Sequence, residues 1–346
     1  MNDFARALEI TPAPDAGRDQ SLVTVVIPAY NAAHTVDETL RSVRSQTHRN
    51  LEILVVDDGS MDATPAIVAN HAAVDARVRL IAQENAGVAA ARNRGIAEAK
   101  SDLIAPLDAD DLWAPSKIEK QLWALRQAGE KTALVYTWFA VIDSDGHVRD
   151  LEHQPRDAGQ VLRRMCRGNL VGNGSSALMR KSAIVEAGGF DSGLRSAHAQ
   201  GCEDLLLYFR IAERHDFALV PEHLTGYRRH PETMSEDALQ MLRSYHLVTR
   251  EMYRKYPVYA DEIRLGEADL ADWLMRKALR KLRLNTAVAI FTHIARTDLR
   301  YSLAKFLPGL FARGGRKLLA TQRRGAGKQT PPAFQIGSPG NVEAGS

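Results

Sequence analysis

The sequence contains little cysteine: Cys166 and Cys202 are the only two among 346 residues. Neither belongs to a Cys-x-x-Cys pair, so the sequence indicates neither a disulfide framework nor a structural zinc site. It also lacks a charge-free apolar run of about 18 residues, which excludes a transmembrane helix. The N-terminus has neither the basic start nor the apolar stretch of a signal peptide. These absences predict a cytoplasmic protein.

Two phosphate-binding patterns are missing as well. The sequence has no GxxxxGK[ST], and no GxGxxG follows its first apolar run, which argues against P-loop enzymes and dinucleotide dehydrogenases. A formal net charge of +3 is too small to indicate nucleic-acid binding. A nucleotide bound by this chain would therefore be held by side chains and a metal ion.

Short β-branched runs alternate with helical patterns over the first third of the chain. Runs at 23–27, 51–56, 78–81 and 103–107 predict strands, and the segments 36–43, 63–73 and 88–99 between them predict helices. Further strands are expected at 133–142, 217–220 and 224–228, with an amphipathic helix at 202–214 and helices from 235 onward. This order predicts an α/β fold, with a mixed, mostly parallel, Rossmann-type sheet flanked by helices and a C-terminal helical extension.

The composition divides the chain into four parts. Residues 1–20 are rich in Ala, Pro and Asp and predict a flexible leader. Residues 21–236 form the α/β domain, and residues 237–322 form the helical extension. The Gly, Pro, Gln and Ala of residues 323–346 predict a disordered tail.

Polar side chains follow several of the predicted strands. Asn31 follows the first strand, Asp57 the second, and Asp108 and Asp110 the fourth. Ligands of open α/β sheets bind at the carboxyl ends of the strands, so these residues predict a site there. Clustered carboxylates repel one another unless a cation lies among them, and oxygen ligands suit Mg²⁺ or Mn²⁺. The alternative is that the acidic pair forms a solvated turn.

In order and spacing, these segments resemble the family 2 glycosyltransferases of the GT-A fold. The resemblance covers residues 22–235 and rests on the motifs Val25-Val26-Ile27-Pro28-Ala29-Tyr30-Asn31, Val55-Val56-Asp57-Asp58-Gly59-Ser60, Asn85-Ala86-Gly87, Ala91-Arg92-Asn93-Arg94-Gly95, Leu107-Asp108-Ala109-Asp110-Asp111, Gly188-Gly189-Phe190-Asp191, Glu203-Asp204 and Tyr227-Arg228-Arg229-His230.

The resemblance implies a role for each motif residue. Donor-binding residues would be Pro28, Tyr30, Asn31 and Asp57 around a pyrimidine base, Arg92 near the base and diphosphate, and Asp108 with Ala109 near the ribose or sugar. Asp110 would bind the metal, and His230 would approach the metal and diphosphate. Asp204 would be the catalytic base, and Glu203 would support it or contact the acceptor.

The implied activity is metal-dependent transfer of a sugar from a nucleoside-diphosphate donor, UDP ahead of dTDP or GDP, to a hydroxyl of a glycan or lipid-linked acceptor. A single base opposite the leaving group implies inversion at the anomeric carbon. Two alternatives remain open. The chain could bind nucleotide sugars without catalysis, or it could be a sugar nucleotidyltransferase, although the glycine-rich start of the latter is missing.

Basic residues crowd toward the C-terminus and alternate with apolar stretches. They include Arg276, Lys277, Arg280, Lys281 and Arg283. Basic amphipathic helices could lie on the anionic inner face of the cytoplasmic membrane, or they could form a cap on the α/β domain with their cations in water.

Overall fold

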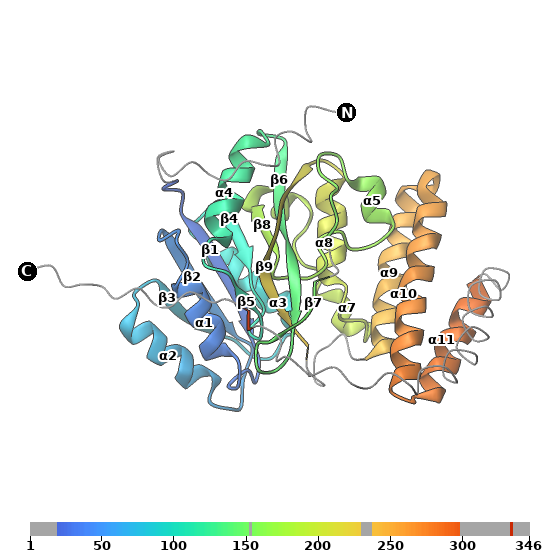
Figure 1. Ribbon diagram of the computed structural model, residues 1–346, viewed down its shortest axis with the longest axis horizontal. Coiled ribbons are helices and arrows are strands. Elements are labelled where there is room, and N and C mark those ends of the chain that lie inside the picture. Colours follow the sequence, from blue (N-terminus) through green and yellow to red (C-terminus); the bar gives the residue numbers. More distant parts are fainter. Residues whose placement is uncertain (1–18, 152–153, 230–236, 298–332, 335–346) are drawn as a thin grey trace, which may run out of the picture.

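The computed structural model describes residues 19–151, 154–229, 237–297 and 333–334. Figure 1 shows one sheet with helices on both of its faces and a group of C-terminal helices stacked beside it. The predicted α/β fold is confirmed. Residues 1–18 of the predicted leader and most of the predicted tail lie outside the described residues.

A nine-stranded mixed sheet forms the centre of the domain, with the order β3-β2-β1-β4-β8-β6-β9-β5, and β7 pairs with β6. The four N-terminal strands β1 to β4 are parallel to one another, and β6 runs parallel to β9. The strands are β1 Val23–Ala29, β2 Leu51–Asp57, β3 Val78–Ala82, β4 Leu103–Pro106, β5 Leu112–Trp113, β6 Thr132–Ile142, β7 Val148–Asp150, β8 Ala177–Arg180 and β9 Asp216–Arg228.

Helices cover both faces of this sheet, and the last three described helices stack beside it (Figure 1). The helices are α1 Val36–Arg44, α2 Thr64–Val74, α3 Val88–Glu98, α4 Lys117–Gln127, α5 Leu162–Cys166, α6 Lys181–Glu186, α7 Gly193–Ser196, α8 Glu203–Ala212, α9 Ala238–Lys255, α10 Ala260–Arg280 and α11 Leu284–Thr297. The short 3₁₀ helix η4, Pro257–Tyr259, joins α9 to α10.

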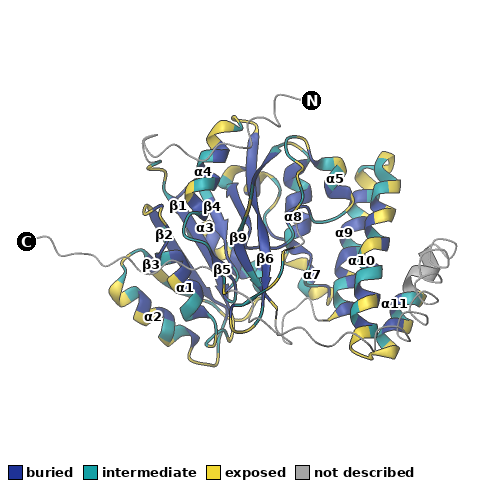
Figure 2. Ribbon diagram, viewed as in Figure 1, coloured by how far each residue is buried: buried dark blue, intermediate teal, exposed yellow. Residues whose placement is uncertain are grey.

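Strands β1 and β2 are buried on both faces, which is why they appear in the sequence as continuous apolar runs (Figure 2). Alternate residues of β1 enter different cores. Val26 packs in the cluster that includes α3 and α8, whereas Val25 and Ile27 pack in the cluster that includes α1 and α2. At Gly95 of α3, an added Cβ would lie 2.4 Å from Cγ1 of Val26, so only glycine allows α3 this close to the sheet.

The structure differs from the sequence-based expectations at the short strands β5, β7 and β8, which were not expected, and at β9. Residues 217–220 and 224–228, expected as separate strands, belong to the single strand β9, which continues through register shifts against β6. The segment between residue 142 and Phe190 had no expected strand, but it contains β8, which joins the two halves of the sheet by pairing with β4 and β6. A four-residue strand is too short to show a clear period.

The C-terminal helices pack together and against the α/β domain. Their shared core includes Leu242 of α9, Leu274 of α10 and Ile290 of α11. Val248 and Met252 of α9 enter the core that contains α8. The described part of the extension is thus a helical cap. Among the described residues, none of the helices has the length and apolar character that crossing a membrane requires.

Candidate active site

A cleft of about 1110 Å³ runs along the carboxyl ends of the parallel strands. Nine of the eleven predicted site residues line it, whereas Asp57 lies outside the lining and His230 lies outside the described residues. In chain order, these nine residues are Pro28, Tyr30, Asn31, Arg92, Asp108, Ala109, Asp110, Glu203 and Asp204. The cleft therefore brings together motifs that lie up to 176 positions apart in the sequence.

One end of the cleft is formed by the loops after β1 and β2. Asn31 has a φ of 49°, and its backbone N–H donates to Oγ of Ser60 at 2.9 Å while its Oδ1 accepts from the backbone N–H of Met61 at 2.8 Å. Tyr30 is 53% exposed. The two loops are thus tied together, and the Tyr30 ring remains accessible to a ligand.

Asp57 and Asp58 end β2 in different environments. Asp57 is buried, and its Oδ1 has no hydrogen-bond partner among the described residues. Asp58 lines the cleft, and its carboxylate accepts from Nε2 of Gln83 at 2.7 Å and from the backbone N–H groups of Ala86 and Gly87, both at 2.8 Å. Asp58 therefore fixes the turn that begins α3, a role that the sequence analysis did not assign.

Arg92 joins two acidic motifs. Its guanidinium is 2% exposed and donates to Oδ1 of Asp108 at 2.5 Å and to Oε1 of Glu203 at 2.9 Å. The ring of Phe190 lies beneath it, with 5.0 Å between Cζ of Arg92 and the ring centroid. Arg92 is therefore not a solvated helix residue. It holds the loop after β4 against the start of α8.

The segment 173–176 positions the acidic loop, and the sequence analysis missed it. Oγ of Ser175 donates to Oδ2 of Asp111 at 2.5 Å and accepts from the backbone N–H of Asp108 at 3.0 Å. At Gly174, an added Cβ would lie 2.6 Å from Nη2 of Arg92. The small residues Gly174 and Ser175 are the only sequence signal, and such residues are common in ordinary loops.

Arg228 holds the same loop from the other side. It is 1% exposed, and its Nε donates to the carbonyl of Asp110 at 2.7 Å while its backbone N–H donates to Oδ1 of Asp111 at 2.8 Å. Its Nη2 also pairs with Oε2 of Glu38 in α1 at 2.6 Å. The acidic loop is thus fixed before any ligand binds, which lowers the entropy cost of binding.

Asp204 lies in the first turn of α8 and lines the cleft. Its Oδ2 accepts from Nδ2 of Asn169 at 2.9 Å, and its Oδ1 accepts from the backbone N–H of Leu205 at 2.7 Å. Burial, followed by the charge of Glu203, raises the pKa of Asp204 to about 7. A carboxylate with this pKa can accept a proton near neutral pH and release it again.

The chemistry of the acidic loop fits a divalent cation. Burial raises the pKa of Asp108, and the charge of Asp110 raises it further although Arg92 lowers it. Burial also raises the pKa of Asp111, and the charges of Asp110 and Asp108 add to that effect. A cation beside Asp110 would relieve this repulsion, and Mg²⁺ and Mn²⁺ prefer such oxygen ligands.

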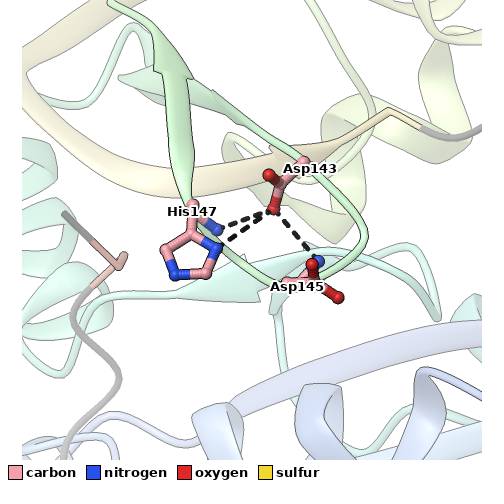
Figure 3. A group of neighbouring side chains, drawn as sticks. All are labelled: Asp143, Asp145 and His147. Atoms are coloured by element: carbon pink, nitrogen blue, oxygen red, sulfur yellow. Dashed lines mark hydrogen bonds and ion pairs between the residues drawn. The ribbon is translucent and has the colours of Figure 1, made fainter. Parts of the chain in front are cut away.

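A second group of possible metal ligands lies on the turn between β6 and β7 (Figure 3). Oδ1 of Asp143 accepts from the backbone N–H groups of Asp145 and His147, at 3.0 and 2.9 Å, and its Oδ2 accepts from Nε of Arg149 at 2.7 Å. These contacts already account for the Asp143 carboxylate as the centre of a hydrogen-bonded turn. We therefore assign no metal to this group.

Residues 24–188 match the model of glycosyl transferase family 2. EpsH of Bacillus subtilis (strain 168) is 33% identical over 217 residues, which cover 60% of this chain and 61% of EpsH. The chain thus spans less than two thirds of that relative. The UDP-Glc:alpha-D-GlcNAc-diphosphoundecaprenol beta-1,3-glucosyltransferase WfgD of Escherichia coli is 42% identical over 105 residues, which cover 30% of this chain and 41% of WfgD.

The fold has solved counterparts. One is the mannosyltransferase PcManGT from Pyrobaculum calidifontis, solved in complex with GDP-Man and Mn²⁺. It matches with a TM-score of 0.55 and 21% sequence identity, and the match covers 92% of this chain and 87% of the PcManGT chain. The likeness shows a shared GT-A fold. Together with the family match over residues 24–188 and the motifs gathered in the cleft, these similarities support a glycosyltransferase of family 2.

Proposed function

We propose that the chain is a metal-dependent, inverting glycosyltransferase that moves a sugar from a nucleoside-diphosphate donor to a hydroxyl of a glycan or lipid-linked acceptor in polysaccharide synthesis. The observation that carries this proposal is the pair of contacts from Arg92 to Asp108 and Glu203. They hold the acidic loop and the residue next to the base Asp204 at the same cleft.

The donor would lie over the sheet edge. Tyr30 and Asn31 line that end of the cleft and would contact the base. Asp57, which is buried outside the lining, would accept from the N–H of a pyrimidine ring through its unpartnered Oδ1 when the base binds. We favour UDP because WfgD, by its name, uses UDP-Glc. Asp110 would hold Mg²⁺ or Mn²⁺, with His230 as a further ligand and Asp108 near the ribose or sugar, and the bound ion would neutralise charge on the leaving diphosphate.

Asp204 would remove the proton of the acceptor hydroxyl as that oxygen attacks the anomeric carbon. The attack and the departure of the diphosphate occur on opposite sides of that carbon, so its configuration inverts. Glu203 would act as a positioning residue, because its Oε1 accepts from Arg92 at 2.9 Å and its Oε2 accepts from the backbone N–H of Gly201 at 3.0 Å. Both of its oxygens are thus engaged by the protein.

Two variants test the division of roles. Asp204→Asn should lower transfer by at least about 10²-fold, because the general base is lost, while metal-dependent donor binding stays within about twofold of the unmodified protein. Asp110→Ala should weaken both transfer and donor binding, measured by calorimetry with Mn²⁺. Equal losses of donor binding in the two variants would contradict the roles proposed here.

A further inference from the structure

The cleft extends beyond the sheet edge to a wall made by the C-terminal helices. The wall residues are Met241 and Tyr245 of α9 and Gly266, Asp269, Leu270 and Trp273 of α10. Asp204 and its partner Asn169 line the same cleft. A ligand on this wall would therefore share a continuous space with the proposed base.

Close backbone packing fixes the wall against the loop that carries Asn169. At Gly266, an added Cβ would lie 2.3 Å from the carbonyl oxygen of Arg167 and 2.6 Å from Oη of Tyr245. Any larger residue at 266 would push α10 away from this loop. The wall is thus a built part of the cleft, and glycine at this position permits it.

Aromatic rings position a cation where the strand β9 meets the wall. Cζ of Arg229 lies 5.6 Å from the ring centroid of Tyr227 and 5.9 Å from that of Trp273, and all three residues line the cleft. Nζ of Lys277 lies 4.9 Å from the Trp273 centroid. Ring faces attract cations, and a guanidinium held in this way presents a planar set of donors that matches phosphate oxygens.

We propose that this wall is the acceptor site, and that it takes a carbohydrate attached to a phosphate or diphosphate, whose anionic group binds Arg229. The inference rests on the proposed function: the donor lies over the sheet edge, so the acceptor must approach Asp204 from the remaining side of the cleft. Met241 and Leu270 offer apolar surface beside the sugar or its carrier. The anionic group could come from a free sugar phosphate or from a lipid-linked one.

The test begins with the donor site filled by UDP and Mn²⁺. Three probes are then titrated by calorimetry: N-acetylglucosamine 1-phosphate, phenoxyundecyl diphosphate-N-acetylglucosamine, and an uncharged undecyl N-acetylglucosaminide. We expect at least one phosphorylated probe to bind ten times more tightly than the uncharged glycoside. Binding of the free sugar phosphate would identify the headgroup as sufficient, whereas binding of the lipid form alone would show that the carrier also contacts the wall.

Two variants test whether the phosphorylated probe contacts Arg229 and Trp273. Arg229→Gln should weaken binding of the phosphorylated probe at least tenfold and leave the Kd of UDP within about twofold, and Trp273→Leu should weaken the same probe. Arg254→Gln, an exposed arginine of α9 outside the cleft lining, is the matched control and should change neither affinity. Circular dichroism melting confirms that each variant is folded.

Three results would overturn the inference: no phosphorylated probe binds, the uncharged glycoside binds equally well, or Arg229→Gln weakens UDP as much as the probe. The last result would assign Arg229 to the donor diphosphate. If UDP itself fails to bind the unmodified protein, the proposed function fails instead, so the two failures are distinguishable.

Discussion

Arg92 links motifs from distant parts of the chain. It is separated from Asp108 by 16 positions and from Glu203 by 111 positions, and it contacts both. A charge that is 2% exposed is costly unless it is paired, and removing one member of such a network leaves the others buried and uncompensated. The ion pairs therefore hold the acidic loop and α8 in a fixed relation at the cleft.

Asn169 provides a residue-scale prediction. Its Nδ2 donates to Oδ2 of Asp204 at 2.9 Å, which favours the charged carboxylate, so Asn169→Ala should raise the pKa of Asp204 above about 7. Transfer depends on the deprotonated base, so activity is present above this pKa and lost as the pH falls through it. We expect the acidic limb of the kcat/KM profile to move upward by about one pH unit.

Asn50→Ala is the control for that profile, because Asn50 is exposed and its Nδ2 bonds to the carbonyl of Gln20. Its acidic limb should coincide with that of the unmodified protein. An unchanged limb in Asn169→Ala, with lower activity at every pH, would show that Asn169 has only a structural role.

The sequence predicted the motif residues better than their supports. Asp108, Asp110 and Asp204 could be found because they stand in ordered motifs of a known family. Asn169 and Ser175 could not, because they act through contacts to residues 35 to 67 positions away. A single long-range hydrogen bond leaves no periodic pattern in the sequence.

At the scale of elements, local pattern predicted the parallel strands well, because continuous burial produces continuous apolar runs. It predicted the strands β8 and β9 poorly. The four residues of β8 owe their conformation to pairing with β4 and β6, and β9 continues past Pro221, where the expected strands were separated. Tertiary pairing decided both cases, which a single sequence does not show.

Lys117, the first residue of α4, gives a prediction at this scale. It is fully buried, and Nζ donates to Oε1 of Gln121 at 2.9 Å and lies 4.0 Å from the ring centroid of Trp113. Burial lowers the pKa of Lys117 well below its ordinary value. The unfolded chain therefore binds one more proton than the folded protein between the two pKa values, so stability rises with pH across that range.

We expect Lys117→Met to remove this dependence, which amounts to at most about 1.4 kcal/mol of unfolding free energy per pH unit. Urea unfolding at pH 7 and pH 9 measures it. Lys100→Met, at an exposed position, should keep the dependence of the unmodified protein. Equal pH dependence in all three proteins would show that Lys117 is not buried as the structure describes.

At the scale of the whole molecule, the C-terminal extension acts as a cap and also has a surface on which exposed apolar and basic side chains lie together. Around the turn from α10 to α11, Leu282 and Leu284 are 83% and 63% exposed, beside the exposed cations Arg280, Lys281 and Arg283. Exposed leucines next to cations suit the surface of an anionic membrane, where each cation adds about 1 kcal/mol. Packing of the cap and contact with a membrane are compatible, because different faces are used.

We therefore predict that the protein sediments with phosphatidylglycerol-containing liposomes at low salt and less so at 0.5 M NaCl. Replacing Arg280, Lys281 and Arg283 by Gln should lower the partition coefficient onto these liposomes more than tenfold. Liposomes of phosphatidylcholine alone are the control. Absence of binding to the anionic liposomes at low salt would contradict a membrane role for this surface.

The central claim is that the cleft binds a nucleotide sugar through a metal held by the acidic loop. Calorimetric titration with UDP, dTDP and GDP sugars, first with Mn²⁺ and then with EDTA, tests it most directly. We expect a UDP sugar to bind with Mn²⁺ and EDTA to abolish this binding. Folded protein that binds none of the donors with Mn²⁺, or that binds one equally well in EDTA, would contradict it.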